Sequence, residues 1–459
     1  MLLTEQQRSL TRKSLCVSAV FIQQSPPKKI LIFGIPTPKM TNMQELERLL
    51  GPKLREIFTH FPILALVGAR QSGKSTLIRQ IFGKDMETFV FDPVQDLANA
   101  RKDPDFFLQN HPAPLFLDEV QYAPELLPAL KRKVDTEGRK GMYILSGSQN
   151  FSVMKNISES LAGRVYIQEL YPMCERELDE KISSPSFLKE WLESGGTLEY
   201  SNIIKFFTEI PKPKEPLLNR IWKGGFPGLL HIPDSFFSGF WNSYVQTYIE
   251  RDVRLLANIE SLQSFGNFFS LLSSLTANEI NYNELGRELG IDRKTAVHWA
   301  GLANSGFQWL EIPAFHRNSI KRISSKKKGF FSDTGLISHF QKIPSPSVLA
   351  SHPFLGRMAE TYFFLEIFKL CSTYNMTPNF SHFRSHSGAE VDLILEYGGK
   401  VFPFEMKIKT NPDRKDCRGI NKFNELFPEL RTAPGIILCS IERPEKIQEN
   451  VIAVPYWIL

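Results

Sequence analysis

One glycine-rich segment constrains the fold of this chain more than any other feature of its sequence. It matches the pattern GxxxxGK[ST], follows an apolar run at residues 62–67 that is typical of a buried strand, and precedes a helical pattern at 75–82. Glycines let backbone N–H groups turn inward around an anion, and the helix directs its positive end at the same point. A phosphate-binding P-loop is therefore predicted. Its candidate nucleotide-binding residues are Gly68, Ala69, Arg70, Gln71, Ser72, Gly73, Lys74, Ser75 and Thr76.

The polar residues of this loop and of a later acidic pair have distinct expected roles. Lys74 is expected to reach the β- and γ-phosphates of ATP, and the hydroxyl of Ser75 is expected to ligate Mg²⁺. The apolar segment LFLDE at residues 115–119 ends on two acids, of which Asp118 is expected to hold Mg²⁺ through water. Glu119 is then the candidate general base for the attacking water. The alternative is an ordinary surface pair of acids at a strand end.

Further apolar runs predict a parallel sheet around this loop. The candidate strands are residues 62–67, 86–91, 114–117 and 142–145. Short apolar strands that alternate with helices indicate an α/β fold with helices on both faces of a parallel sheet, as in a P-loop NTPase. Ligand sites in such sheets lie at the carboxyl ends of the strands, where Gly68, Asp118 and Ser148 are all expected.

Two more polar residues are candidates for contacts with the γ-phosphate. Ser148, in the segment LSGSQN, is expected to sense it, with a simple turn as the alternative. Arg164, in the segment SLAGR, is a candidate to place its guanidinium on a γ-phosphate, in this chain or in a neighbouring subunit of a homo-oligomer. A structural ion pair is the alternative for Arg164.

The motifs, taken together, resemble a known family. The segments GARQSGKSTL, LFLDEVQ, LSGSQN, SLAGR, GGFP and YIERDVR are similar to those of prokaryotic AAA-superfamily ATPases that carry a C-terminal domain of uncharacterised function. The resemblance covers roughly residues 45–459 and implies ATP as the nucleotide, an ASCE-type P-loop core, a helical region, a winged helix and a nuclease-like end. It implies no physiological role.

These features divide the chain into five expected parts. They are a poorly ordered extension at 1–42, an ATPase core at 43–180 that opens with an amphipathic helix at 43–59, a helical region at 181–260, a winged-helix-like domain at 261–345 and a nuclease-like domain at 346–459. A Pro/Ser segment at 343–347 marks the last boundary as a linker.

A helix-turn-helix pattern lies within the fourth part. Residues 282–290 form a predicted helix that ends at Gly290, and Asp292 is expected to cap a second helix at 293–303. The start of that helix carries Arg293, Lys294, Thr295 and His298, which suit a DNA groove. Residues 317–328 hold six basic residues and no acidic one, and they are candidates for phosphate contacts. The alternatives are protein packing, regulation of the ATPase, or a solvated hairpin.

The last part carries an acid followed by an E-x-K motif. Asp392 lies in a predicted strand, and Glu405 and Lys407 follow on the next one, in a pattern that resembles the PD-(D/E)xK nuclease core. Asp392 and Glu405 are the expected Mg²⁺ ligands, Lys407 would orient the attacking water, and Glu360 on an upstream helix would complete the site. The alternatives are a site kept for binding nucleic acid and a structural cluster of ion pairs.

The amino-acid composition limits the possible classes of protein, but it does not identify a binding partner. The net charge of +6 permits contact with DNA but does not require it. The five cysteines are far apart and form no CxxC pair, which argues against zinc or disulfides and favours the cytoplasm. No apolar run reaches the roughly 18–20 residues of a membrane span. Basic residues precede an apolar run at 15–22 in a pattern that superficially resembles a signal peptide, but the run is short and Gln23 and Gln24 make a poor cleavage site. Translation could begin at Met40 or Met43.

Three functions are compatible with these patterns. The first is an ATPase whose hydrolysis cycle acts on DNA through the C-terminal region. The second is a nucleotide-dependent switch that binds a protein partner without nucleic acid, and the third is an ATP-dependent nuclease. Stimulation of ATP turnover by DNA separates the first two.

Overall fold

The computed structural model describes most of the chain from residue 46 onward. The described residues are 46–83, 86–91, 97–148, 160–248, 262–318, 320, 322 and 325–459. Contacts divide the chain into two units, Met1–Gln44 and Glu45–Leu459. The expected extension at 1–42, the start of the helix expected at 43–59, the motif residues 149–150 and 249–254, Cys16 and Lys321 lie outside the described residues.

A parallel five-stranded sheet forms the core of the N-terminal half, as predicted. Its strands, in spatial order, are β2 (Glu87–Val90), β3 (Leu115–Asp118), β4 (Tyr143–Gly147), β1 (Ile63–Val67) and β5 (Val165–Glu169). Strand β4 lies between the P-loop strand β1 and the strand β3 that ends at Asp118. The strand β5 was not predicted, because its sequence VYIQE is only partly apolar.

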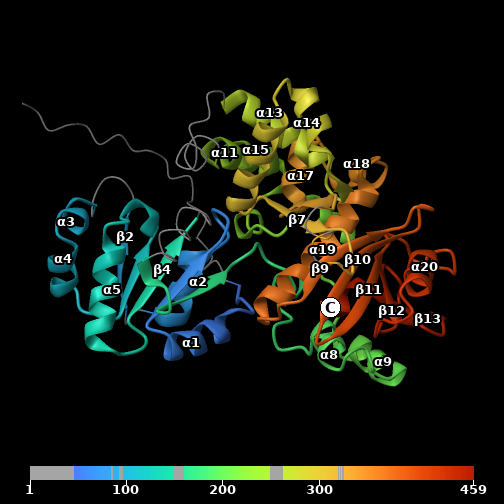
Figure 1. The fold of residues 1–459 in the computed structure, drawn as a ribbon, viewed down its shortest axis with the longest axis horizontal. Coiled ribbons are helices and arrows are strands. Elements are labelled where there is room, and N and C mark those ends of the chain that lie inside the picture. Colours follow the sequence, from blue (N-terminus) through green and yellow to red (C-terminus); the bar gives the residue numbers. More distant parts are fainter. Residues whose placement is uncertain are drawn as a thin grey trace, which may run out of the picture. The chain divides into compact units, whose positions relative to one another are not determined.

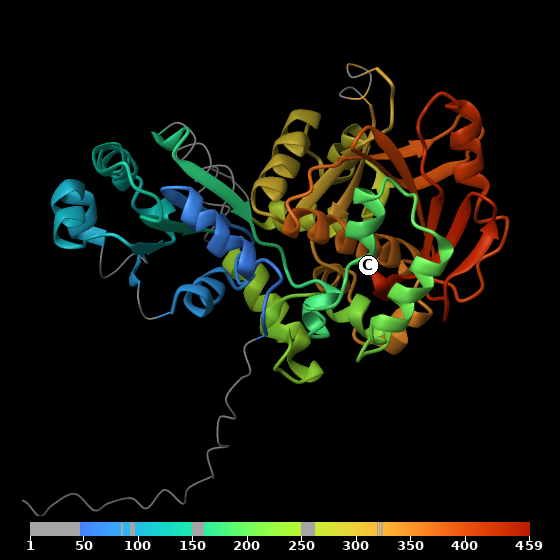
Figure 2. The ribbon, with the colours of Figure 1, turned by 90° about the horizontal axis from the view of Figure 1, so that it is seen from below.

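Helices cover both faces of this sheet (Figure 1, Figure 2). Side chains of β1 alternate between the two faces. Leu64 and Leu66 pack with α1 (Gly51–His60) and α2 (Lys74–Phe82). Ile63, Ala65 and Val67 belong to the core cluster on the other face, which includes α4 (Pro104–Asn110) and α5 (Leu126–Glu137). Helix α3 (Leu97–Lys102) and the short η2 (Val120–Tyr122) complete this half.

The first described helix is shorter than the pattern predicted. A helix was expected at 43–59, but α1 begins at Gly51, with Pro52 in its first turn. Proline is accepted there because it lacks only an N–H that has no helical partner, whereas a deeper position would clash with the preceding turn. The described residues just before α1 are not helical. Instead, Leu49 N donates to Glu177 Oε1 at 2.9 Å.

The region after the sheet is mainly helical, as predicted. Its described elements are α7 (Glu175–Leu178), α8 (Phe187–Glu193), α9 (Tyr200–Glu209), α10 (Leu217–Lys223), η3 (Pro227–Leu229), η4 (Asp234–Phe236) and α11 (Phe237–Thr247). Buried aromatic rings join them. Trp222 stacks on Phe237 with ring centroids 4.2 Å apart, and Phe226 meets Trp241 edge-on at 5.1 Å.

Two helices joined by a short turn lie where the helix-turn-helix pattern predicted them. It lies in a module made of α13 (Leu262–Ser274), β6 (Asn278–Glu279), α14 (Tyr282–Leu289), α15 (Arg293–Ser305), β7 (Trp309–Pro313) and β8 (Lys327–Phe331), whose strands pair antiparallel in the order β6-β8-β7. Gly290 ends α14 at φ 67°, and the Asp292 carboxylate caps α15 by accepting from Lys294 N at 2.7 Å and Thr295 N at 3.0 Å.

A six-stranded mixed sheet forms the C-terminal part. Its strands, in spatial order, are β13 (Glu445–Gln448), β14 (Val451–Pro455), β12 (Gly435–Cys439), β11 (Lys400–Met406), β10 (Glu390–Tyr397) and β9 (Asn379–Arg384). Helix α19 (Leu355–Thr373) shares a core cluster with Phe402 and Phe404 of β11, and α20 (Arg418–Leu426) shares another with Val401. The two helices therefore pack on opposite faces (Figure 1).

The segment at 343–347 is part of the packed structure. Helix α17 (Thr334–Phe340) precedes it, and Ser345 caps α18 (Pro346–Ala350) by accepting from Val348 N. Trp222 Nε1 of α10 donates to Ile343 O at 2.9 Å. The chain ends at η6 (Tyr456–Ile458). None of the described helices combines the length and apolar character that a bilayer-spanning helix needs.

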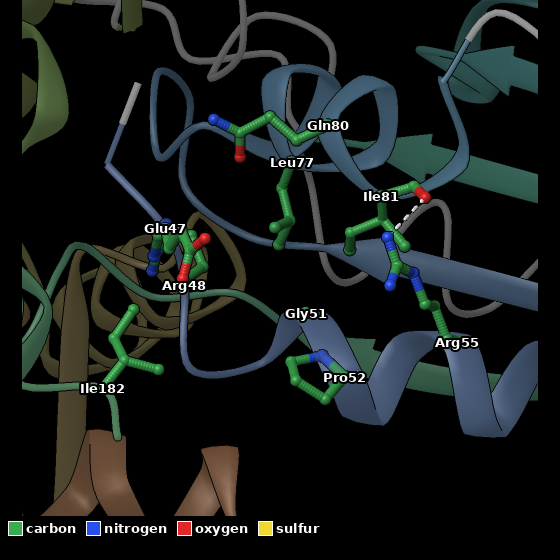
Figure 3. Close-up of a pocket in the computed structure, with 9 residues that line it drawn as sticks. All are labelled: Glu47, Arg48, Gly51, Pro52, Arg55, Leu77, Gln80, Ile81 and Ile182. Atoms are coloured by element: carbon green, nitrogen blue, oxygen red, sulfur yellow. Dashed lines mark hydrogen bonds between the residues drawn. The ribbon is translucent and has the colours of Figure 1, made fainter. Parts of the chain in front are cut away.

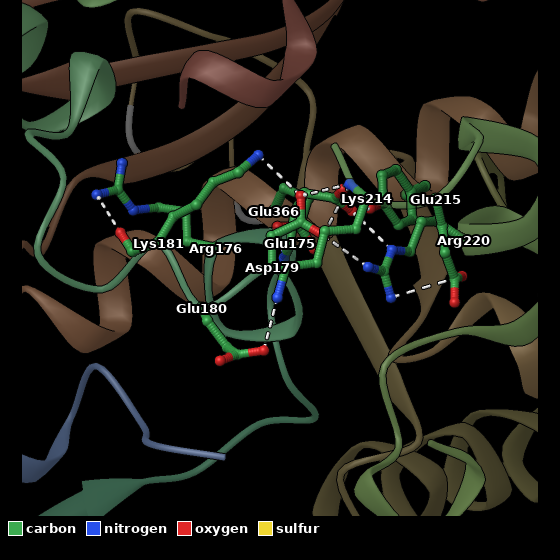
Figure 4. Close-up of polar contacts among 10 residues, drawn as sticks. Glu175, Arg176, Asp179, Glu180, Lys181, Lys214, Glu215, Arg220 and Glu366 are labelled. Atoms are coloured by element: carbon green, nitrogen blue, oxygen red, sulfur yellow. Dashed lines mark hydrogen bonds and ion pairs between the residues drawn. The ribbon is translucent and has the colours of Figure 1, made fainter. Parts of the chain in front are cut away.

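A buried ionic junction, defined here as Glu175, Asp179, Lys181, Arg220 and Glu366, joins α7, α10 and α19 (Figure 4). Arg220 Nη2 donates to Asp179 Oδ1 at 2.7 Å, and its Nε lies 3.6 Å from Glu175 Oε2. Glu175 N in turn donates to Glu366 Oε2 at 2.7 Å. The segment that leaves the ATPase sheet is thus fastened to the helical region and to the C-terminal part through charges removed from water.

Candidate functional site

The P-loop runs from the end of β1 to the start of α2, and steric constraints explain why two of its residues are glycines. A Cβ on Gly68 would lie 2.1 Å from the backbone oxygen of Leu170, because the chain crosses closely just after β5. Gly73 has φ 94°, in the left-handed region that favours glycine. Gln71 also has a positive φ, of 60°. Gly73 thus meets a local backbone requirement, whereas Gly68 is required by its close contact with a distant segment.

The side chain of Lys74 makes hydrogen bonds to the backbone of the loop that it follows. Its buried ammonium donates to Gly68 O and Ala69 O, both at 2.9 Å. Ser72 is also buried, and its Oγ has no hydrogen-bond partner among the described residues. The site thus holds a positive charge and an unused hydroxyl at the N-terminus of α2, where the helix dipole favours an anion.

The two expected metal ligands of the P-loop site lie together. Ser75 Oγ donates to Asp118 Oδ2 at 2.6 Å. The other carboxylate oxygen accepts from Ser146 Oγ of β4, the strand between β1 and β3. A hydroxyl and a carboxylate are ligands that Mg²⁺ accepts, and Mg²⁺ in such sites takes its remaining ligands from water and phosphate. The residues present therefore fit the expected ion.

Glu119 and Ser148 are joined by a residue that the sequence analysis passed over. Gln121 Nε2 donates to Glu119 Oε2 at 2.5 Å and to Ser148 Oγ at 3.4 Å. Glu119 has φ 57°, and its N–H donates to Ser146 Oγ at 3.3 Å. The motif LFLDEVQ contains Gln121, but its spacing from Ser148 gives no signal that the two side chains meet.

Arg164 forms the ion pair that the sequence left open as its alternative role. Its Nε and Nη2 lie 2.5 and 3.0 Å from the two carboxylate oxygens of Asp135, and Nη1 donates to Ala162 O at 2.7 Å. The hydrogen bonds from Arg164 lower the pKa of Asp135. Among the described residues, this guanidinium therefore contacts Asp135 and Ala162.

Arg48 reaches the P-loop from the N-terminal side. Its guanidinium donates to Ser72 O at 2.9 Å and to Tyr171 O at 2.8 Å, and its Nε lies 3.0 Å from Glu177 Oε1. The sequence analysis missed this residue because it falls within a segment expected to be a regular helix. Arg48 ties the loop that would hold phosphates to α7.

The motif GGFP approaches the same loop from the helical region. A Cβ on Gly73 would lie 3.7 Å from Pro227. Gly225 N donates to the buried carboxylate of Asp333 at 2.8 Å, and Gly225 O accepts from Met173 N at 2.8 Å. A Cβ on Gly225 would lie 2.3 Å from Met173 O, so the close approach explains the glycine.

A cavity of about 420 Å³ lies beside the P-loop helix (Figure 3). Its floor includes Leu77 and Ile81 of α2, and Pro52 of α1 and Ile182 add apolar surface. The lining residues are Glu47, Arg48, Gly51, Pro52, Arg55, Leu77, Gln80, Ile81 and Ile182. Leu77 directly follows Thr76, so this space adjoins the loop that would hold phosphates.

The C-terminal candidates also come together, in an acidic cluster defined as Glu360, Glu390, Asp392 and Glu405. Asp392 Oδ2 accepts from Met406 N at 2.8 Å, and Lys407 Nζ lies 3.4 Å from that oxygen and 2.6 Å from Glu405 Oε1. Burial raises the pKa of Glu405 to about 8, and the charge of Asp392 adds to the effect. Burial likewise raises the pKa of Glu360 to about 8, against the opposing charge of Lys328.

Lys328 is the residue of this cluster that the sequence analysis placed elsewhere. It was grouped with the basic run at 317–328 as a candidate for phosphate contacts, but its ammonium is 1% exposed and pairs with Glu360. Its neighbours in the run are engaged as well: Arg317 pairs with Glu429, Arg322 with Glu396 and Lys327 with Glu311. In the described part of the chain, no three His, Cys, Asp or Glu side chains are placed to share a metal ion.

Part of the N-terminal half of the chain matches a known protein family. Residues 60–178 match the AAA domain family. Together with the parallel five-stranded sheet, this match shows a P-loop NTPase core of the AAA type in the N-terminal half. Residues 214–347 match a domain of unknown function (DUF8612), and residues 355–459 match another (DUF4143). The AAA domain contains the candidate residues from Gly68 to Arg164, whereas Arg48 precedes it and Pro227 follows it.

Similar proteins cover nearly the whole chain. Uncharacterized protein Mb2031c of Mycobacterium bovis and uncharacterized protein Rv2008c of Mycobacterium tuberculosis are each 24% identical over 424 residues, which is 92% of this chain and 86% of each relative. Among solved structures, the Walker-type ATPase paby2304 of Pyrococcus abyssi is 15% identical with a TM-score of 0.38, covering 64% of this chain and 94% of its own. The Thermotoga maritima RuvB Holliday junction branch migration motor is 15% identical with a TM-score of 0.27, covering 61% and 96%.

Proposed function

We propose that this chain binds ATP with its phosphates in the P-loop and hydrolyses it in a Mg²⁺-dependent reaction. The observation that carries this proposal is the contact between Ser75 and Asp118, because it joins the P-loop to the acid of a separate strand, as a nucleotide-bound metal ion requires. When bound, Mg²⁺ would neutralise charge on the phosphate oxygens. The wide spacing of the cysteines supports a reducing, cytoplasmic setting for this activity.

The proposed roles follow from where each polar group lies. Lys74 would exchange its two carbonyl acceptors for phosphate oxygens, and the N–H groups at the start of α2 would bind the same anion. Glu119 would take the proton from the attacking water. Gln121 would hold the Glu119 carboxylate in place and link it to Ser148, because its amide donates to both side chains.

We assign Arg164 a structural role. A guanidinium that stabilises charge on a γ-phosphate, in this chain or in a partner, would first have to leave Asp135, with which it makes a two-pronged ion pair. No catalytic contribution from a neighbouring copy is therefore part of the proposed mechanism.

We further propose that the cavity beside α2 receives the base of the nucleotide. Its apolar surfaces, Leu77, Ile81 and Ile182, suit a flat aromatic ring, and Glu47 and Gln80 offer polar groups at the edge. Its volume of about 420 Å³ leaves room for a purine and part of the ribose. Ile182→Trp, at a partly exposed lining position outside the P-loop helix, should narrow the cavity and weaken ATP binding while leaving inorganic triphosphate binding unchanged.

The experiment is Mg²⁺-dependent ATP turnover by the full chain. Lys74→Ala should abolish nucleotide binding, and Glu119→Gln should bind ATP while turnover falls by about 10²- to 10⁴-fold. Arg79→Ala is the matched control, because Arg79 lies on the exposed side of the same helix. Tight ATP binding by Lys74→Ala would remove the P-loop assignment, and undiminished turnover by Glu119→Gln would place the base elsewhere.

DNA is the proposed effector of this ATPase. The support is the α13–β8 module, whose order of helices and strands is that of a winged helix, with Arg293, Lys294 and His298 exposed on α15. The basic run gives less support than expected, since most of its side chains pair with acids of this chain. Contact with DNA would therefore rest on α15.

A pair of double variants tests this role. Arg293→Ala with Lys294→Ala should remove stimulation of turnover by double-stranded DNA and lower the salt dependence of binding. Lys189→Ala with Lys205→Ala removes the same charge from exposed positions on α8 and α9 and should leave stimulation unchanged. If wild-type turnover is indifferent to DNA, the alternative function, a switch that binds a protein partner, is favoured instead.

A further inference from the structure

The acidic cluster contains an ammonium group from another part of the fold. Lys328 belongs to β8, the central strand of the small sheet, whereas Glu360 lies on α19 and the remaining acids lie on β10 and β11. Lys328 Nζ pairs with Glu360 Oε1 and lies 3.3 Å from Glu390 Oε1 and 3.8 Å from Asp392 Oδ1. One nitrogen thus faces three carboxylates at the point where the nuclease pattern calls for a metal ion.

The oxygens that the pattern assigned to Mg²⁺ are already engaged. Asp392 directs one oxygen toward Lys328 and gives the other to Met406 N and Lys407 Nζ. Glu405 Oε1 pairs with Lys407 and Glu360 Oε1 pairs with Lys328, so each of the three expected ligands already contacts an ammonium group. Among the described residues, Glu405 Oε2 is a buried oxygen without a hydrogen bond. A cation that takes about six ligands would have to displace both lysines from these carboxylates. The donor set therefore does not fit a Mg²⁺ centre.

We infer that Lys328 permanently takes the place of a divalent cation in this cluster, so that the C-terminal domain binds no catalytic metal and does not cleave DNA. A metal ion that ligated Asp392 and Glu360 would lie next to the ammonium and would be repelled by it.

The ammonium is also held in place by its surroundings. Both ends of the connection between β7 and β8 are fastened to β9 of the C-terminal sheet, since Phe315 N donates to His382 O at 2.6 Å and His382 Nε2 lies 3.2 Å from Lys326 O. Arg322 adds an ion pair to Glu396 at 2.6 Å. Withdrawal of Lys328 would require this whole interface to open, so the lysine acts as a fixed counter-ion of the cluster.

Titration of the nucleotide-free full chain with Mn²⁺, followed by electron paramagnetic resonance of the free ion, tests the inference. Wild type and Asp392→Asn should titrate identically, because neither has a cation site at the cluster. Lys328→Met, which keeps the length of the side chain and removes its charge, should gain one Mn²⁺ per chain, bound at least tenfold more tightly than by wild type. Adding Asp392→Asn to Lys328→Met should remove the new site.

Several results would overturn the inference, and they do not depend on the P-loop. A wild-type Mn²⁺ site lost in Asp392→Asn would do so, as would a folded Lys328→Met that gains no site. If Lys328→Met does not fold, the comparison of wild type with Asp392→Asn still decides. Plasmid cleavage gives a second readout: wild type should leave supercoiled DNA intact with Mn²⁺, and cleavage that disappears in Lys407→Ala would show a working metal centre.

Discussion

Replacement of Arg220 by methionine should destabilise the chain far more than the loss of an ordinary ion pair. Arg220 is buried and contacts the carboxylates of Asp179 and Glu175, which are buried with it. Removing one partner of a buried ion pair typically costs about 3–5 kcal/mol, because the remaining charge has neither water nor a counter-ion. Methionine fills much of the same volume, so the cavity left behind adds little.

The pKa of Glu175 gives an independent measure of this cost. Burial raises it from 4.5 to about 7 even with Arg220 present, which means that ionised Glu175 already costs the folded chain about 3 kcal/mol at pH 8. Without Arg220 the pKa rises further, and the carboxyl becomes protonated at neutral pH. The destabilisation by Arg220→Met should therefore be largest at pH 8 and should shrink as the pH falls toward 6.

Urea unfolding of Arg220→Met and Arg132→Met at pH 8 is the assay. Arg132 pairs with Asp105 at 2.5 Å, but the two side chains are 59% and 53% exposed, so its loss should cost about 0–1 kcal/mol. Addition of Glu175→Gln to Arg220→Met should restore part of the lost stability. If Arg220→Met and Arg132→Met unfold within 1 kcal/mol of each other, the junction does not contribute as a buried ion network.

Two further predictions concern the P-loop and the acidic cluster. Gly68→Ala should lower both the thermal midpoint and ATP binding, because its Cβ would lie 2.1 Å from Leu170 O, whereas Gly239→Ala on α11 meets nothing within 4 Å and should be neutral; equal midpoints would contradict the steric argument. The pKa values of Glu360 and Glu405 are raised to about 8 from 4.5, so their contribution to stability is present at low pH and is lost as the pH rises toward 8. Thermal midpoints measured from pH 5 to pH 9 should fall in wild type and fall less in Glu360→Gln, and an equal fall in both would refute this assignment.

The sequence correctly predicted those elements that depend mainly on residues close together in the chain. The P-loop could be predicted from nine consecutive residues, because their motif follows a strand directly, has a glycine with a positive φ at Gly73 and leads into a helix. The helix-turn-helix was equally accessible, since Gly290 and Asp292 end one helix and cap the next through contacts within a few residues. Strand β5 was missed because its place in the sheet depends on pairing with β1, about a hundred residues earlier.

Residues whose role depends on distant partners could not be assigned from the sequence. Arg48 contacts the P-loop and a helix more than 120 residues away, and nothing near it in the sequence indicates either contact. The site prediction at Asp392, Glu405 and Lys407 brought together the correct side chains, but it lacked Lys328, which arrives from the neighbouring sheet.

The basic run at 317–328 shows why charge patterning alone does not identify a nucleic-acid surface. Six positive residues without an acidic one read as a phosphate-binding segment only while their partners are unknown. In the folded chain, four of these residues pair with acids that lie between 16 and 112 positions away in the sequence: Arg317, Arg322, Lys327 and Lys328. The run therefore neutralises the face on which the C-terminal domain packs. The proposal of DNA binding therefore depends on α15, whose exposed Arg293 and Lys294 take part in none of the described ion pairs.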